Sequence, residues 1–352
     1  MTAPVTSEPA KVKEARDFTY IKSTKRRLSE YEAVTCYLQP QAEGDALTWE
    51  QDGYLRRDDG SYAWTPRSTA LVHPHWWDFR DPSATWFRPY ARQQGEQERA
   101  IARLTDDTVA SGQAADLDPA WRDDILAGHY AVWSFVEWGL FRALVPQARE
   151  SLADTIGMAM LFEAFDRVRH HQDIERMMLT LEEAVPGFDA LGAKDLWLTG
   201  ERYQPIRKVV EELMYTVRDW AEVAVAVNLV LDPILTELCV SRIVGRPAGH
   251  RGDPVTQLIV SSVDRDRRRS LAWTQALVRM VTEDAVPEAK ANRAAINGWL
   301  ARWTPPILEA AQGFAALYAP QAPKTATYAE VLADITGAQR ALVSELGLEG
   351  PV

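Results

Sequence analysis

Two segments of the sequence place acidic and basic side chains three residues apart, a spacing at which two residues share one face of a helix. The first segment runs from Asp166 to His170, and the second runs from Asp264 to Arg268. Both contain the pattern Asp-x-x-Arg, and the second lies 98 positions after the first. By itself the pattern indicates surface ion pairs, which contribute little to stability. Its recurrence at such a distance suggests two related halves of one helical site.

The same spacing is used by helical bundles that bind two iron ions. Two helices of such a bundle supply one Glu each, and two others supply a Glu-x-x-His pair that points into the bundle. A common form of the pair is Asp-Glu-x-Arg-His. Laid on the first segment, this form puts Arg167 at the Glu position and His170 at the His position. Laid on the second, it puts Arg265 and Arg268 there.

The two single-Glu positions belong to the preceding helices. Counting 30 residues back from Arg167 reaches Glu137, and the corresponding position in the second half is expected near Leu231. Of the six positions, only Glu137 and His170 therefore carry residues that bind iron. A guanidinium cannot act as a metal ligand and stays charged at any accessible pH. The sequence predicts a di-iron site that has been dismantled, in which Arg side chains neutralise leftover carboxylates such as Glu137.

The elements that hold these residues are predicted to be long helices. From about residue 91 the apolar residues follow a helical period, and no alternation typical of β-strands is present. Asp-Pro steps at 118, 232 and 253 are typical helix starts, because Asp caps the helix and Pro suits its first position. Prolines 146, 305 and 306 are expected to interrupt helices. The first of the expected helices ends near residue 145. The later ones are expected to span residues 149–183, 205–231, 232–245, 253–283 and 328–346.

Three regions are expected along the chain. Residues 1–16 are polar and read as a disordered tail. Residues 17–90 carry aromatic residues without a regular period, so they are expected to form an extended arm over the bundle or over a partner. Residues 91–352 are expected to form the helical bundle, so the fold class is all-α.

Composition narrows the function classes. The chain has 352 residues, a net charge of -11 and two cysteines, at positions 36 and 239. An acidic surface repels phosphate, so nucleic acid and membrane are not expected partners. Two cysteines cannot form a disulfide framework, and no secretory signal or transmembrane run is evident, so a cytoplasmic location is expected. Glycine-rich phosphate loops and nucleophile-elbow motifs are absent from the sequence.

Two aromatic segments carry a family resemblance. The run from Phe18 to Glu32 resembles small (β) hydroxylase subunits of bacterial soluble di-iron multicomponent monooxygenases. So does the Trp-Asp-Phe-Arg-Asp-Pro segment from Trp77, with Trp86 and Tyr90 after it. The resemblance spans about residues 17–345 and is strongest for the propane monooxygenase-like group. It implies a ferritin-like, ribonucleotide-reductase-like long-helix bundle.

The resemblance also implies partners and cofactors. A large (α) subunit would hold the di-iron centre, and two such pairs would form an α2β2 assembly. A reductase with FAD and an iron–sulfur cluster would supply electrons from NADH, together with a coupling protein. The complex would hydroxylate propane or a related small hydrocarbon, cyclic ether or ketone. The small subunit would bind no cofactor and contribute no catalytic residue.

The arm is the expected contact region for the large subunit. Its candidate interface residues are mostly aromatic: Phe18, Tyr20, Tyr31, Trp76, Trp77, Arg80, Asp81, Trp86 and Tyr90. Two alternatives remain open at this point. One is an independently active di-metal carboxylate oxidase, which would need about four carboxylates and two His in the bundle. The other is a helical interaction protein unrelated to oxygenases.

Overall fold

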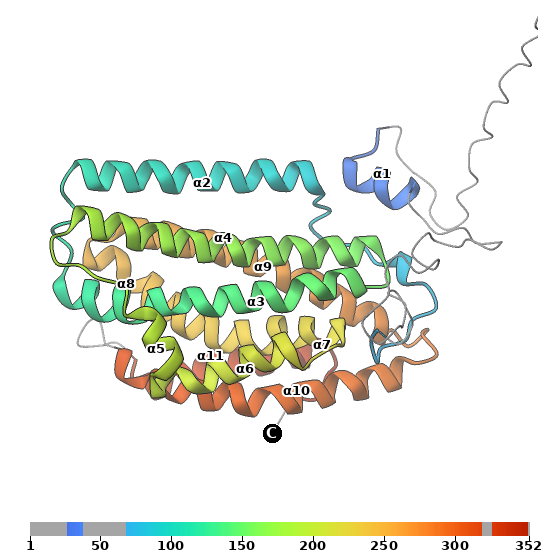
Figure 1. The fold of residues 1–352 in the computed structure, drawn as a ribbon. Coiled ribbons are helices and arrows are strands. Elements are labelled where there is room, and N and C mark those ends of the chain that lie inside the picture. The colour runs from blue at the N-terminus through green and yellow to red at the C-terminus, as the bar shows by residue number, and fades with distance from the viewer. Residues whose placement is uncertain (1–26, 38–67, 319–325, 351–352) are drawn as a thin grey trace, which may run out of the picture.

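The computed structural model describes residues 27–37, 68–318 and 326–350. Within these ranges every regular element is a helix, and no strand is formed. Figure 1 shows long helices lying side by side in layers, with α2 along one edge and α10 along the opposite edge. The expected all-α bundle is therefore confirmed for the described part of the chain.

Two long helix pairs form the centre of the bundle. The first pair is α3 (Ala131–Glu150) and α4 (Asp154–Ala184), which pack along one another. The second pair is η5 (Ala226–Gly245), a π-helix, and α9 (Pro254–Thr282). Asp253 starts α9 as expected, because its carboxylate accepts the backbone N–H of Thr256 at 2.9 Å. The four helices that the motif analysis requires are thus present.

The η5 helix is buried along almost its whole length. Its residues are apolar on nearly all sides, because α9, α10 and α11 all pack against it. The stretch Trp220–Arg251, which contains η5, is long and apolar enough by composition to cross a membrane, and 89% of its apolar window is buried. Burial in the core accounts for this hydropathy.

Outer helices cover the two central pairs. They are α2 (Phe87–Ala110), α6 (Gln204–Tyr215), α10 (Ala289–Gln312) and α11 (Tyr328–Glu345). Buried residues recur on one face of α2, as the helical period requires. The shorter elements are α1 (Glu30–Tyr37), η2 (Trp76–Asp78), η3 (Trp121–Tyr130), α5 (Ala193–Thr199), η4 (Glu201–Tyr203), α7 (Trp220–Val225), α8 (Arg246–Ala248), η6 (Gly249–Arg251) and η7 (Ala315–Leu317).

Several expected helix boundaries are wrong. Pro146 lies inside α3, and Pro305 and Pro306 lie inside α10. Pro233 lies inside η5, so the Asp-Pro step at 232 does not start a helix. The helix expected from 205 to 231 is instead broken before Asp219, whose carboxylate caps α7. Packing on the bundle outweighs the loss of one helical hydrogen bond at each of these prolines.

Residues 68–86 lie across one end of the chain's own bundle. The Ser68 hydroxyl donates to the carbonyl of Glu150 at 2.9 Å. The Val72 backbone N–H donates to the Asn292 side-chain oxygen at 2.9 Å. The α2 helix then begins at Phe87, inside the region expected to be irregular. This described part of the predicted arm covers its own chain, and whether the arm also contacts a partner stays a prediction.

Candidate functional site

Glu137 lies at the centre of the bundle on α3. Its Oε1 accepts the indole N–H of Trp133 at 2.9 Å. The same oxygen lies 3.1 Å from Nδ1 of His170, on α4. Nε2 of His170 lies 3.0 Å from the hydroxyl of Tyr130. The two ligand-type residues predicted to persist, Glu137 and His170, are therefore in direct contact, and both are buried.

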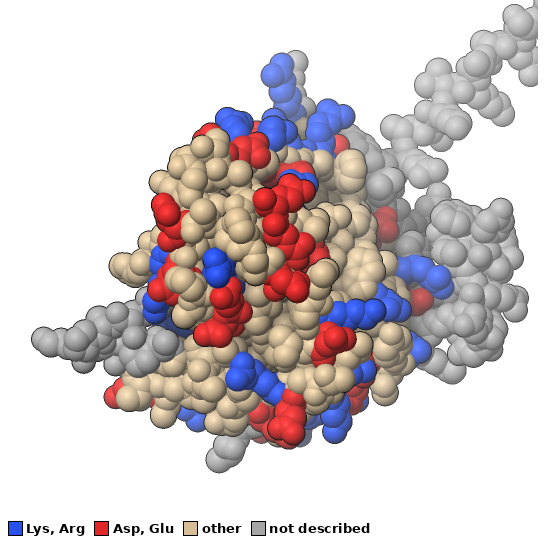
Figure 2. All heavy atoms as spheres, turned by 60° about the vertical axis from the view of Figure 1, so that its left-hand side comes forward, with Lys and Arg blue, Asp and Glu red and all other residues tan. Residues whose placement is uncertain are grey.

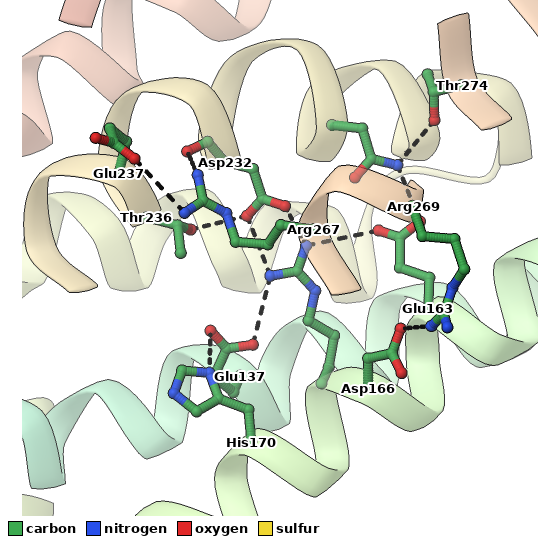
Figure 3. Close-up of polar contacts among 12 residues, drawn as sticks. Glu137, Glu163, Asp166, His170, Asp232, Thr236, Glu237, Arg267, Arg269 and Thr274 are labelled. Carbon is green, nitrogen blue, oxygen red and sulfur yellow. Dashed lines mark hydrogen bonds and ion pairs between the residues drawn. The ribbon is translucent and has the colours of Figure 1, made fainter. Parts of the chain in front are cut away.

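Arg167 fills the space between carboxylates that come from different helices. Its Nη1 and Nη2 donate to the two oxygens of Asp232 on η5, at 3.1 and 2.5 Å. Its Nη1 is also 3.4 Å from Oε2 of Glu137. Its Nη2 is 3.6 Å from Oε1 of Glu163. Thr236 donates to Oδ1 of Asp232 at 2.8 Å. One guanidinium thus neutralises carboxylates from three helices, and Figure 3 labels all three of these carboxylates: Glu137, Glu163 and Asp232.

Glu163 forms the other edge of this charge cluster. Its Oε2 accepts the side-chain N–H of Asn228 at 2.9 Å and the indole N–H of Trp273 at 3.1 Å. Asn228 also donates to the Thr274 hydroxyl at 2.9 Å. Hydrogen bonds from η5 and α9 therefore fix a carboxylate of α4. The sequence analysis did not single out Glu163, although it lies four residues before Arg167 on the same helix face.

The two buried glutamates have opposite pKa shifts. Burial raises the pKa of both, because it penalises the charged form. For Glu137 the electrostatic attraction of His170 and Arg167, together with hydrogen bonds from His170 and Trp133, outweighs burial and lowers the pKa to about 2. For Glu163 burial outweighs the attraction of Arg167, and the pKa is raised. Of the two glutamates, Glu137 is therefore the one that the cluster holds in its ionised form.

A second set of ion pairs joins α4 to α9 beside the cluster. Arg169 on α4 pairs with Asp266 on α9 at 2.5 Å. In return, Arg269 on α9 pairs with Asp166 on α4. Gln94 of α2 donates to both aspartates, at 3.2 and 3.1 Å. The arrangement is reciprocal, so the two Asp-x-x-Arg motifs that matter are 100 positions apart in the sequence.

The predicted register on α9 is wrong by two residues. Arg265 and Arg268 were placed at ligand positions inside the bundle, but both side chains are exposed. The interior positions are held by Arg267 and Ser270, which line the remaining cavity beside His170. Both registers match the template equally well at its Asp and Arg positions.

The predicted ligand position on η5 is off by one residue. Leu231 was the expected occupant, but the residue that faces Arg167 is its neighbour Asp232. The backbone carbonyl of Asp232 also accepts a hydrogen bond from Nη2 of Arg267 at 2.6 Å. A carboxylate therefore persists at this position. A fixed count of 30 fails because the two halves are spaced differently. Glu137 lies 30 residues before Arg167, whereas Asp232 lies 35 residues before Arg267.

Comparison with known proteins assigns this bundle to a family. The family described as Methane/Phenol/Alkene Hydroxylase matches residues 54–285. The chain belongs to this family. The beta chain of methane monooxygenase component A from Methylococcus capsulatus is 31% identical, over 88% of this chain and 80% of the relative. The hydroxylase small subunit of propane 2-monooxygenase from Rhodococcus jostii is 29% identical, over 96% and 90%.

Two solved hydroxylases support the same fold for this family member. Phenol hydroxylase from Pseudomonas sp. OX1 has a TM-score of 0.75 at 17% identity, covering 99% of both chains. The toluene 4-monooxygenase hydroxylase has a TM-score of 0.66 at 23% identity, covering 83% of this chain and 94% of the other. At these identities the likeness concerns the fold alone. Together with the relatives above, it confirms the predicted resemblance to small hydroxylase subunits.

The side chains of this family member do not fit a di-iron centre. Arg167 and Arg267 stand at the two Glu positions of the pairs, and neither can donate a lone pair to a metal. No group of three or more His, Cys, Asp or Glu in the described ranges is arranged to hold a metal ion. The cavity left between Arg167, His170 and Ser270 is about 10 Å³. That volume is at the limit for a single water molecule.

Several predicted interface residues are used within the chain. Tyr31, Asp81 and Tyr90 are buried. The Asp81 backbone N–H donates to the Tyr31 hydroxyl at 2.6 Å. The Tyr90 hydroxyl donates to Oδ1 of Asp166 at 2.9 Å. Tyr31 thus holds two parts of the arm together, and Tyr90 joins α2 to α4, whatever else the arm contacts.

The other predicted interface residues are half-buried or lie outside the described residues. Trp76 packs edge-on against Trp220, with ring centres 5.5 Å apart, and Trp86 packs against Tyr31 at 6.0 Å. Arg80 donates to the backbone carbonyl of Trp77 at 2.6 Å. Phe18 and Tyr20 are outside the described part of the chain. A partner role for this set stays a prediction.

The face in Figure 2 bears on the expected partners. It carries acidic and basic side chains interspersed, with a band of acidic residues across the upper half. Nucleic-acid sites instead present a continuous basic patch that neutralises phosphates. This face has no such patch.

Proposed function

We propose that this chain is the non-catalytic small subunit of the hydroxylase component of an NADH-dependent di-iron monooxygenase. The observation that carries the proposal is the position of Arg167 between Glu137 and Asp232, at the centre of the family's bundle. At this place the guanidinium of Arg167 takes the structural role that a metal centre has in an active bundle. It joins carboxylates of separate helices and leaves no room for chemistry.

The partner large subunit would hold the di-iron centre. Two large and two small subunits would form an α2β2 hydroxylase, served by a coupling protein and by a reductase with FAD and an iron–sulfur cluster. A cytoplasmic location is part of this proposal. The names of the relatives support the large partner subunit, because a beta chain or small subunit implies a larger companion chain.

The proposed substrate is propane or a related small hydrocarbon, cyclic ether or ketone. Small subunits of propane 2-monooxygenases cover 96% of this chain. Relatives from methane, toluene and phenol monooxygenases also match, so the substrate would be selected in the large subunit. The small subunit's contribution to turnover would be to fold and position that subunit.

Iron analysis tests the proposal directly. The small subunit is purified alone and also together with its large subunit, and iron is measured by emission spectroscopy. We expect iron only in the complex, at about two ions per large subunit. Two irons bound to the small subunit alone would overturn the proposal. Failure of the two chains to associate would overturn it as well.

A further inference from the structure

The outer face of α4 carries an apolar stripe that the core does not use. Met158, Leu161, Phe165 and Val168 follow one another at separations of three, four and three residues. Each of them is half-buried, and none belongs to the hydrophobic core. A surface helix normally has one apolar stripe, which faces the core, and a polar opposite face. A second set of apolar residues on α4, including Ile156, Met160 and Ile174, faces the core, so this helix is apolar on two sides.

The neighbouring helix α3 continues the apolar surface. Trp138, Phe141 and Val145 recur at separations of three and four residues along it. The exposed fraction of Trp138 is 41%, and that of Val145 is 37%. The Trp138 ring packs beside Phe141 and beside His171 of α4, at 5.3 and 5.4 Å between ring centres. The two stripes thus belong to one surface, which we call the α3–α4 face.

Two described helices border the α3–α4 face without closing it. Tyr90 of α2 lies beside Phe165, and Trp197 of α5 stacks on Phe135 of α3, while Trp138 and Val145 stay exposed. Figure 1 looks onto this face, and α3 and α4 lie in front of α9, with α2 beside α4 and α6 beside α3. The central helix η5 is instead covered by α10 and α11. An apolar face of this kind on a family member marks a site of protein association.

The size of the face suits a stable interface. The 20 residues of α3 span about 30 Å at 1.5 Å per residue, and α4 runs alongside for that length. Two neighbouring helices about 10 Å apart then present roughly 600 Å² before side-chain relief is counted. A standard protein interface buries about 800 Å² on each partner.

Resting on the proposed function, we propose that the large hydroxylase subunit packs helices of its own against the α3–α4 face. A separation of three and four residues is the pattern that helices present to other helices when ridges pack into grooves. A small subunit also needs a chain different from itself as its companion. Because the same two helices hold Glu137 and Arg167 inside, the ion cluster would stiffen the surface on which the large subunit rests.

Charge substitutions on the face test this inference in the complete complex. Leu161→Glu and Val168→Glu each place a carboxylate on the stripe, where the partner would bury it. We expect each to weaken association with the large subunit by at least about 30-fold, which is the effect of a hot-spot residue. Association is measured by interferometry on the purified subunits, and folding is checked by thermal unfolding.

The matched control is Leu191→Glu, because Leu191 is an equally apolar residue that is 80% exposed and lies in the loop between α4 and α5, outside both stripes. It is expected to leave association unchanged. Trp138→Ala removes a large contact without adding charge, so it keeps the test decisive if the Glu variants do not fold. Unchanged association for folded Leu161, Val168 and Trp138 variants would overturn the inference.

Two further outcomes separate the inference from its foundation. If the unaltered subunits do not associate, the proposed function fails, and the inference fails with it. If the subunits associate normally but the face variants only convert a dimer of this chain into a monomer, the occupant is a second copy. That result would overturn the inference and leave the proposed function standing.

Discussion

Arg167 on α4 and Asp232 on η5 form a two-pronged ion pair in the middle of the bundle, with N–O distances of 3.1 and 2.5 Å. The side chain of Arg167 is only 5% exposed, and that of Asp232 is 6% exposed. Taking both charges out of water is costly, and the pair offsets that cost only while both partners are present. The stability of the bundle therefore depends on this contact in a way that the sequence does not reveal.

Replacing Arg167 by Met is expected to destabilise the protein by about 3–5 kcal/mol, because the carboxylates of Asp232 and Glu137 would be left buried without their cation. Urea unfolding followed by circular dichroism measures the change. Arg265→Met is the matched control on α9, and its exposed side chain predicts an effect within about 0.5 kcal/mol. Equal effects of the two substitutions would show that the ion pair does not hold the helices together.

His129 of η3 is expected to make the protein acid-sensitive. Burial lowers the pKa of its imidazole from 6.5 to about 4, and Nε2 lies 3.1 Å from the backbone carbonyl of Cys239. A group with a lowered folded-state pKa contributes stability above its unfolded pKa and loses it as the pH falls. The contribution of His129 is thus complete above about pH 6.5 and is lost on the way to pH 4.

The measurement for His129 is the unfolding free energy at several pH values between 4 and 7, in the unaltered protein and in His129→Gln. Because Gln does not titrate, the variant is expected to show a shallower fall in stability over this window. Parallel pH profiles for the two proteins would mean that the pKa of His129 does not differ between the folded and unfolded states.

Asn292 of α10 holds residues 68–86 against the bundle. Its Nδ2 donates to the carbonyls of Val72 and Val281, both at 2.8 Å, and its Oδ1 accepts the N–H of Val72. Asn292→Ala is expected to cost about 1–3 kcal/mol, because partners are left unsatisfied. Hydrogen exchange at Val72 should accelerate. Asn297→Ala on the same helix removes a contact to Glu349 instead, and should leave Val72 protected.

Gly139 of α3 allows close packing against α6. A Cβ added at Gly139 would lie 2.2 Å from Cγ1 of Val210. Gly139→Ala is therefore expected to destabilise the protein by about 1–3 kcal/mol through overpacking. A Cβ added at Gly298 of α10 would have no atom within 4 Å, so Gly298→Ala should stabilise the protein by up to about 1 kcal/mol. Thermal unfolding of both variants checks the opposite signs.

The sequence by itself determined the fold class and the loss of metal-binding chemistry. Helical periodicity is a local property of neighbouring residues, so an all-α bundle could be predicted without a structure. The chemistry of Arg167 is intrinsic to its guanidinium, so its unsuitability as an iron ligand also followed from its identity. The pairing of Glu137 with His170 and Arg167 needed only a correct spacing between two adjacent helices.

Only the tertiary structure decided which residues of the second half face inward. Arg265 and Arg267 fit the same sequence template, and the choice depends on how α9 is rotated against α4. That rotation is set by the reciprocal pairs of Asp166 with Arg269 and Asp266 with Arg169, which join segments about 100 residues apart. Contacts at such separations depend on global packing, and no local pattern contains them.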